Sequence, residues 1–305
     1  MEKNGMKTLF VCFLVCFLVV AAPSLSACKS DKSDKTETGS LPEFTREDFA
    51  GIDGSTVVIP LVEGWAEKLL SIENGADVIH FNTTPNAIAH LTEGTKEIIF
   101  TTYPSDAEIA AAKAKGVEFE IVPVVNDAFV FLVSSENKVS GLTQEQIRQI
   151  YSGKITNWSA VGGEDFTVMA FQRQEGSGSQ SGMLRFMEGT PLQQAPTEAC
   201  LQEMGALVET VVRPDNGKAS LGYSYYYYVN AMYIKEGIKL LAVDGIAPSH
   251  ETIKKGTYPI VTPYYAIIRK DAPEGGFARK FLEFALSEQG QEIAEQAGYV
   301  GIQAD

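Results

Sequence analysis

The residues best able to do chemistry form a Gly- and Ser-rich run, Phe171–Gly182 (FQRQEGSGSQSG), directly before a helix-like segment, Met183–Met187. Hydroxyl residues and glycines ahead of a helix offer free N–H and O–H donors and the positive end of the helix dipole, which together hold oxyanions. Arg173 adds a planar, charged fork of donors suited to phosphate-like geometry. The alternative for this run alone is a solvated loop with a surface arginine.

Two further loops repeat this chemistry. Gly54-Ser55-Thr56 is followed by the β-branched run Val57–Ile59 and by Pro60, which opens a predicted helix, and Thr83-Thr84 is followed by Pro85 and a second predicted helix. Proline suits the first helical turn because that turn does not use its N–H. Three hydroxyl-bearing loops that each open a helix are hard to attribute to chance, and they indicate an oxyanion site.

Sequence motifs for catalysis are missing. Residues 178–182 read Gly-Ser-Gln-Ser-Gly, with Gln180 where the nucleophile of a G-x-S-x-G motif would stand. The sequence has no Walker A motif and no G-x-G-x-x-G after a strand, and its three histidines lie outside any nucleophile motif. We therefore predict a protein that is not an enzyme and that uses no cofactor and no metal.

The net charge excludes one large class of partner. The 305 residues carry 25 Lys and Arg against 39 Asp and Glu, a formal charge of −14. Nucleic-acid binding requires many cationic contacts to phosphates, so we predict no nucleic-acid partner. A small anion is still compatible, because screening over about 8 Å confines surface charge to its own neighbourhood.

The N-terminus predicts export. Lys3 and Lys7 precede an apolar run, Leu9–Ala22, which is too short to span a membrane as a helix and suits a signal peptide. Leu25-Ser26-Ala27-Cys28 resembles the bacterial lipobox, in which the cysteine is lipidated. The alternative is a plain signal peptide with an incidental cysteine. We predict a lipoprotein signal at residues 1–27, lipidation of Cys28, a flexible polar tether at 28–47, and anchoring to the outer face of the bacterial cytoplasmic membrane through the lipid only.

The body alternates strands and helices. Ile98–Thr102 reads as a strand, and Ser105 with Glu108 forms a capping-box pattern at the start of the next helix. Thr143 and Gln146 repeat that pattern. Strands alternating with helices predict an α/β fold built on mostly parallel sheets.

Two long apolar runs, 121–133 and 258–268, bracket a segment of domain size. Each could be an ordinary buried strand. Taken together, we interpret them as two crossings of a hinge, with the last predicted helix, 276–297, returning to the first lobe. The predicted lobes are residues 48–125 with 262–305, and residues 126–261.

These motifs resemble those of the phosphate-binding proteins of the Pst ABC importer, within the type II periplasmic-binding fold. The segment 142–158 (LTQEQIRQIYSGKITNW) is specific to that family, and Arg173-x-Glu175-x-Ser177-Gly178-Ser179 resembles its Arg-x-Asp-x-Ser-Gly-Thr anion motif. The resemblance implies a two-lobed binding protein that closes on inorganic phosphate and docks on an ABC permease. We expect a monomer.

The resemblance also implies roles for individual residues. Glu175 falls where the family keeps an acid that orients the arginine, although it could also be an exposed carboxylate. The implied anion ligands are Thr56, the N–H of Val57, Thr84 and Thr102 from the first lobe, and Arg173, Ser177, Gly178 and Ser179 from the second.

One position departs from the family. Thr102 stands where the best-known members have an aspartate that accepts the proton of hydrogen phosphate. A hydroxyl can accept that proton or donate to an unprotonated oxygen, so discrimination against sulfate is less strict. The tyrosine run 223–228 resembles the strand end of the family, and it could line the cleft or pack on the next helix.

The sequence thus predicts a lipoprotein that captures inorganic phosphate for an ABC importer. Within the binding class, the alternative ligand is sulfate, molybdate or tungstate. From other classes, the alternatives are a surface lipoprotein for adhesion or sensing and, more remotely, a hydrolase.

Overall fold

A computed structural model describes residues 41–195 and 199–302. The predicted signal peptide (1–27), Cys28 and most of the predicted tether lie outside the described residues. The end of that tether is folded: helix α1 begins at Arg46, and Phe44 packs edge to face on Phe277 with ring centroids 5.6 Å apart. The predicted tether boundary at residue 47 is therefore too late, because an aromatic contact and a helix already form before it.

The main sheet is mixed. Its strands follow the order β1-β2-β11-β3-β8-β5, and β9 and β12 also pair with β3. The β1–β2 and β5–β8 pairs are parallel, whereas β11 runs antiparallel to both β2 and β3, and β3 runs antiparallel to β8. The α/β prediction is confirmed, but the sheets are not mostly parallel, because two long strands of opposite direction pass through the middle. The strands are β1 (Ile52–Gly54), β2 (Ile98–Thr101), β3 (Phe119–Ser134), β5 (Met169–Ala170), β8 (Ser220–Tyr225), β9 (Ile238–Leu240), β11 (Val261–Arg269) and β12 (Val300–Gly301).

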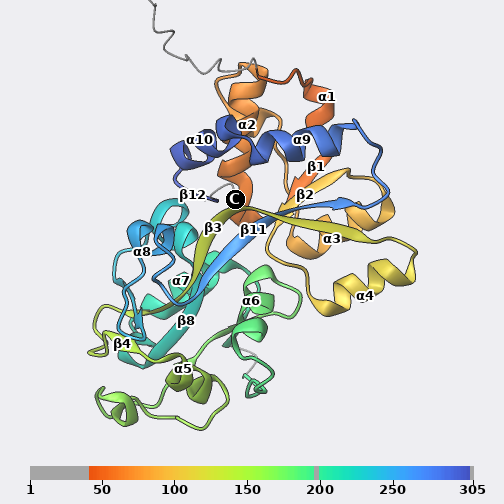
Figure 1. Cartoon of the computed structure of the whole chain (residues 1–305). Coiled ribbons are helices and arrows are strands. Elements are labelled where there is room, and N and C mark those ends of the chain that lie inside the picture. The colour runs from red at the N-terminus through yellow and green to blue at the C-terminus, as the bar shows by residue number, and fades with distance from the viewer. Residues whose placement is uncertain (1–40, 196–198, 303–305) are drawn as a thin grey trace, which may run out of the picture. The chain divides into compact units, whose positions relative to one another are not determined.

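Strand β3 belongs to both ends of this sheet. It pairs with β11 along Phe119–Ala128 and then with β8 along Phe129–Leu132. Figure 1 shows β3 and β11 side by side, between β1 and β2 at one end and β8 at the other. The two apolar runs that we interpreted as hinge crossings form β3 and β11. These strands are paired near the predicted lobe boundaries, where Val261 of β11 is opposite Ala128 of β3.

Local signals placed most helices correctly. Pro85 lies in the first turn of α3, which ends at Gly94 with φ +75°, and the predicted capping boxes open α4 at Ser105 and α5 at Thr143. The helices are α1 (Arg46–Phe49), α2 (Ile59–Leu70), α3 (Thr84–Glu93), α4 (Asp106–Ala114), α5 (Gln144–Tyr151), α6 (Gly178–Phe186), α7 (Met204–Val212), α8 (His250–Lys254), α9 (Phe277–Leu286) and α10 (Glu288–Gln296).

Two local predictions need correction. The run Val57–Ile59 is not extended: Thr56–Val58 forms a short 3-10 helix that leads into α2, and the strand lies earlier, at β1. The single C-terminal helix is two helices, α9 and α10. They are separated at Ser287, whose backbone is extended and whose side chain accepts a hydrogen bond from Gly290 N at 3.1 Å.

The C-terminal helices α9 and α10 lie beside α2 (Figure 1). Aromatic side chains pack them against the first half of the chain. Phe281 is fully buried and lies 5.9 Å from Trp65 and 5.8 Å from Phe100, measured between ring centroids. Trp65 Nε1 also donates to Gly290 O at 2.8 Å. The core at this end of the sheet therefore depends on residues more than 200 positions apart.

Candidate functional site

Four helix N-termini line one cavity of about 540 Å³. They are the 3-10 turn that opens α2 and the first turns of α3, α6 and α7, of which the sequence analysis did not indicate α7. The first N–H groups of a helix have no acceptor within it and carry its positive dipole end, so their convergence favours an anion. The wall consists of Ser55, Thr56, Val57, Thr83, Thr84, Pro85, Thr102, Arg173, Gln174, Ser177, Gly178, Ser179, Gln202, Glu203, Met204, Gly205, Ala206, Glu209, Tyr225, Tyr228 and Tyr233.

The first loop joins β1 to α2. Ser55 N donates to Phe100 O at 3.0 Å, which holds the loop against β2. The Ser55 hydroxyl is buried and has no hydrogen-bond partner among the described residues. Ser55 was not among the predicted ligands, although its place between Gly54 and Thr56 could have suggested it. Thr56 and Val57 line the cavity as predicted.

The second loop and the end of β2 supply two threonines. Thr84 is buried at the start of α3, and its hydroxyl accepts a hydrogen bond from Thr101 Oγ1 at 3.4 Å. Thr102 is also buried, and its hydroxyl interacts only weakly with that of Tyr225. Buried hydroxyls without strong partners are uncommon because each one costs free energy. Ser55 and Thr102, which both line the cavity, carry two such groups.

Arg173 and α6 form the opposite wall. The Ser177 hydroxyl caps α6 by accepting from Gln180 N at 3.2 Å. Arg173 is buried, and it donates from Nη1 to Ser179 Oγ at 3.0 Å. Its Nε donates to Leu201 O at 3.1 Å and its Nη2 to Gln202 O at 2.8 Å. Three of the five guanidinium N–H groups are thus used, which leaves two for a ligand.

The position of Arg173 is set by its own backbone. Its N–H donates to Tyr223 OH at 2.8 Å and to Gln180 Oε1 at 3.1 Å, and Tyr223 in turn donates to Gln180. Burial lowers the pKa of the Arg173 guanidinium. The group still stays protonated at neutral pH, because a guanidinium holds its proton so strongly.

The two walls meet at Gly178. A Cβ atom added there would lie 2.9 Å from Thr102 Oγ1 and 3.0 Å from Thr84 Oγ1. Tyr225, from β8, also donates its hydroxyl to Gly178 O at 3.1 Å. The structure therefore brings Thr84, Thr102 and the α6 loop into contact, and a side chain at residue 178 would push them apart.

Glu175 is not brought to Arg173. It is exposed and does not line the cavity, and the guanidinium instead uses the carbonyls of Leu201 and Gln202. These carbonyls lie on and after β7 (Cys200–Leu201), which pairs with β6 (Gln172–Arg173). The expected orienting acid is thus replaced by backbone acceptors, and no local signal in the sequence indicated them.

Of the two expectations for the tyrosine run, the structure agrees with the first: Tyr225 and Tyr228 line the cavity. Tyr227 does not pack on the next helix but stacks on Tyr299, which follows α10, with ring centroids 3.8 Å apart. Tyr228 also stacks with Tyr233, at 5.7 Å, and the Tyr233 hydroxyl donates to Glu209. This part of the wall is therefore aromatic and acidic, and Tyr228 and Glu203 lie close enough to Arg173 to oppose the fall in its pKa.

No group of three or more His, Cys, Asp and Glu side chains in residues 41–195 and 199–302 could hold a metal ion. In that same part of the chain, no helix is both long and apolar enough to cross a membrane. Cys200 is a free, exposed thiol.

Comparison with known proteins agrees with this geometry. The model of the PBP superfamily domain matches residues 39–289. The phosphate-binding protein PstS of Bacillus subtilis is 23% identical over 308 residues, covering 99% of this chain and 95% of the relative. PstS of Borreliella burgdorferi is 27% identical over 261 residues, covering 84% and 91%.

Solved structures share the fold. A substrate-binding protein assigned to a phosphate ABC transporter of Clostridium perfringens, solved with phosphate bound, superposes with a TM-score of 0.64 at 25% identity. The match covers 83% of this chain and 98% of that one. These relatives are binding proteins by name and not enzymes, as predicted. The resemblance inferred from the motifs is confirmed, and the chain belongs to the PBP superfamily.

Proposed function

We propose that the protein captures inorganic phosphate outside the cytoplasm and passes it to the permease of an ABC importer. One observation carries this proposal: Arg173, four helix N-termini and the hydroxyl-bearing residues Ser55, Thr84 and Thr102 all line one cavity. Fixed donors of this kind stabilise an oxyanion without the cost of reorganising around it. The names of the PstS relatives support phosphate as the anion.

The proposal includes motion and anchoring. We assign residues 48–125 with 262–305 to one lobe and 126–261 to the other, with β3 and β11 as the hinge. A ligand that binds both walls of a cleft stabilises the closed state. Lipidation at Cys28 would tether this body to the outer face of the membrane. Replacement of Cys28 by alanine should then release the exported protein from the membrane fraction, and retention there would contradict the anchor.

The test is calorimetric titration of the purified protein with phosphate. We expect binding that Arg173→Lys weakens by roughly 10–100-fold, because lysine loses the planar fork and one charge-assisted hydrogen bond contributes about 1.5–3 kcal/mol. Arg148→Lys is the matched control. Arg148 also donates to a carbonyl, Phe186 O, at 2.9 Å, but it lines no part of the cavity. Unchanged affinity in Arg173→Lys would place the site elsewhere.

Another tetrahedral oxyanion is the second candidate, and Thr102 is the observation that favours it. A carboxylate at that position would repel a fully ionised anion, whereas a hydroxyl does not. Sulfate, molybdate and tungstate should be titrated beside phosphate, with sulfate competition measured from about pH 5 to 8. Inorganic phosphate changes protonation within that range, and sulfate does not. Binding of none of the four anions would contradict the transport proposal.

A further inference from the structure

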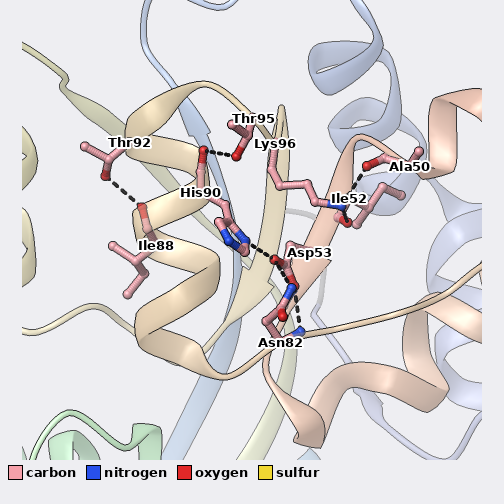
Figure 2. A network of polar contacts seen from close by, with 10 residues as sticks. Ala50, Ile52, Asp53, Asn82, Ile88, His90, Thr92, Thr95 and Lys96 are labelled. Atoms are coloured by element: carbon pink, nitrogen blue, oxygen red, sulfur yellow. Dashed lines mark hydrogen bonds and ion pairs between the residues drawn. The ribbon is translucent and has the colours of Figure 1, made fainter.

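A fully buried carboxylate, Asp53, lies behind the cavity wall at the end of β1. It accepts four hydrogen bonds (Figure 2). Asp53 Oδ1 accepts from Gly54 N at 2.7 Å and from Asn82 N at 2.9 Å. Oδ2 accepts from Asn82 Nδ2 at 2.8 Å and from His90 Nδ1 at 2.7 Å. Both oxygens are thus saturated by donors from three places in the chain.

The donors come from the parts of the chain that build the anion site. Gly54 opens the first loop, and Asn82 directly precedes Thr83 and Thr84 of the second. His90 lies on α3, the helix that the second loop opens. Figure 2 shows Asn82 and His90 converging on Asp53 from the α3 side. A single carboxylate therefore links both loops and the helix behind one of them.

The carboxylate is ionised in this setting. Burial by itself raises the pKa of Asp53, but the hydrogen bonds from Asn82, His90 and Gly54 outweigh it and hold the pKa below its ordinary value. An ionised carboxylate can only accept, so His90 Nδ1 is the donor in that contact. Hydrogen bonds to a buried charge are stronger than neutral ones, and loss of their acceptor leaves buried donors unsatisfied.

The first loop has little freedom to move by itself. A Cβ atom on Gly54 would lie 2.4 Å from Phe100 O, so the backbone of β1 approaches β2 as closely as glycine permits. Ser55 N also donates to Phe100 O. The first loop is therefore fixed against the sheet. Asp53 links the second loop to the first, because its carboxylate accepts hydrogen bonds from both the main-chain N–H and the side-chain amide of Asn82.

We propose that Asp53 is a positioning residue, which sets the spacing between the two loops on the Thr56 and Thr84 side of the anion site. This inference rests on the proposed function. Asp53 does not line the cavity and would touch no ligand. Its effect passes through Gly54 and Asn82 to the N–H and hydroxyl donors that follow each of them.

The first experiment is phosphate titration of Asp53→Asn. The amide is nearly isosteric, but its NH₂ group would face donors that now point at a carboxylate oxygen. We expect the dissociation constant to rise roughly 10–100-fold, the size of effect that groups orienting the ligands of metal sites have. Trp65→Phe is the control. It removes another buried hydrogen bond, from Trp65 Nε1 to Gly290 O, at a residue that lines no part of the cavity, and its affinity should match that of the wild type.

A reciprocal exchange separates positioning from general destabilisation. In the double variant Asp53→Asn with Asn82→Asp, the amide at residue 53 can donate to a carboxylate at residue 82, so the link between the loops is rebuilt with donor and acceptor exchanged. We expect this variant to recover most of the lost affinity. Wild-type affinity in Asp53→Asn, or a folded double variant as weak as the single one, would overturn the inference.

Asn82→Ala is the second variant, for use if Asp53→Asn does not fold. Asn82 is exposed, and alanine there removes only the hydrogen bond from Asn82 Nδ2 to Asp53. We expect that variant to lose up to about tenfold in affinity, and unchanged affinity would again overturn the inference. A wild-type protein that binds no phosphate would instead contradict the proposed function, which is a different outcome.

Discussion

At the level of single residues, Asp127 is a buried carboxylate whose surroundings make stability depend on pH. It is buried where β3 passes from β11 to β8, and it makes no ion pair within the described chain. It accepts hydrogen bonds from Tyr264 OH at 2.5 Å, Ala128 N at 2.7 Å and Tyr227 N at 3.1 Å. Burial raises the pKa of Asp127 to about 7, although these hydrogen bonds oppose that rise.

This raised pKa predicts a pH-dependent stability. Between about pH 4 and 7 the unfolded chain releases the Asp127 proton and the folded chain keeps it, since an unperturbed aspartate has a pKa of about 3.9. A folded state that binds more protons than the unfolded state loses stability as the pH rises. We therefore expect Asp127 to contribute a loss in the free energy of unfolding across that window, of up to about 4 kcal/mol, and no further change above it.

Replacement by asparagine should remove this contribution. Urea unfolding at pH 5, 6, 7 and 8 would show Asp127→Asn gaining stability relative to the wild type up to about pH 7. Asp271→Asn, at an exposed residue paired with Arg269, is the control and should follow the wild-type slope over the same range. Parallel slopes for the wild type and Asp127→Asn would contradict the prediction.

At the level of elements, the proposed site gives the first turn of α6 a role in both folding and binding. The Ser177 hydroxyl caps the helix and also lines the cavity, whereas Thr143 caps α5 in the same way and lines no part of it. Alanine at either cap should cost about 1 kcal/mol in the free energy of unfolding. Thermal unfolding should therefore show similar losses, and calorimetry should show weaker phosphate binding only for Ser177→Ala. Equal affinities in the two variants would mean that Ser177 is a cap and not a ligand.

At the level of the whole molecule, Phe281 of α9 packs against aromatic residues from the N-terminal part of the chain. It is fully buried and contacts Phe44, Phe49, Trp65 and Phe100 from the N-terminal part. Phe281→Ala should lower the free energy of unfolding by about 3–5 kcal/mol, because it deletes buried area and leaves a cavity. Leu184→Ala is the control: that side chain is 50% exposed, and its change should stay within about 0.5 kcal/mol. A loss below about 1 kcal/mol for Phe281→Ala, in urea unfolding, would show that the core can close over the cavity.

Local signals account for the features that the sequence predicted correctly. A proline in a first turn, a capping box or a glycine after a helix acts on atoms a few residues away, so α3, α4 and α5 could be recognised without the rest of the chain. The three hydroxyl-bearing loops were found for the same reason, because a helix N-terminus attracts an anion wherever it lies. The sequence therefore indicated the chemistry of these loops but not how they are arranged in space.

Tertiary structure decided what depends on residues far apart. The antiparallel course of β3 and β11 and the folded end of the tether follow from packing that no short segment contains. The break at Ser287 is instead a local helix cap that the sequence analysis missed. The sequence by itself determined an α/β chain with an arginine and three hydroxyl-bearing loops that each open a helix. Only the fold decided that these loops share one cavity, that backbone carbonyls orient Arg173 in place of Glu175, and that Asp53 links two of them. The physical reason is that a helix cap forms between neighbours in the chain, whereas a binding site forms between neighbours in space.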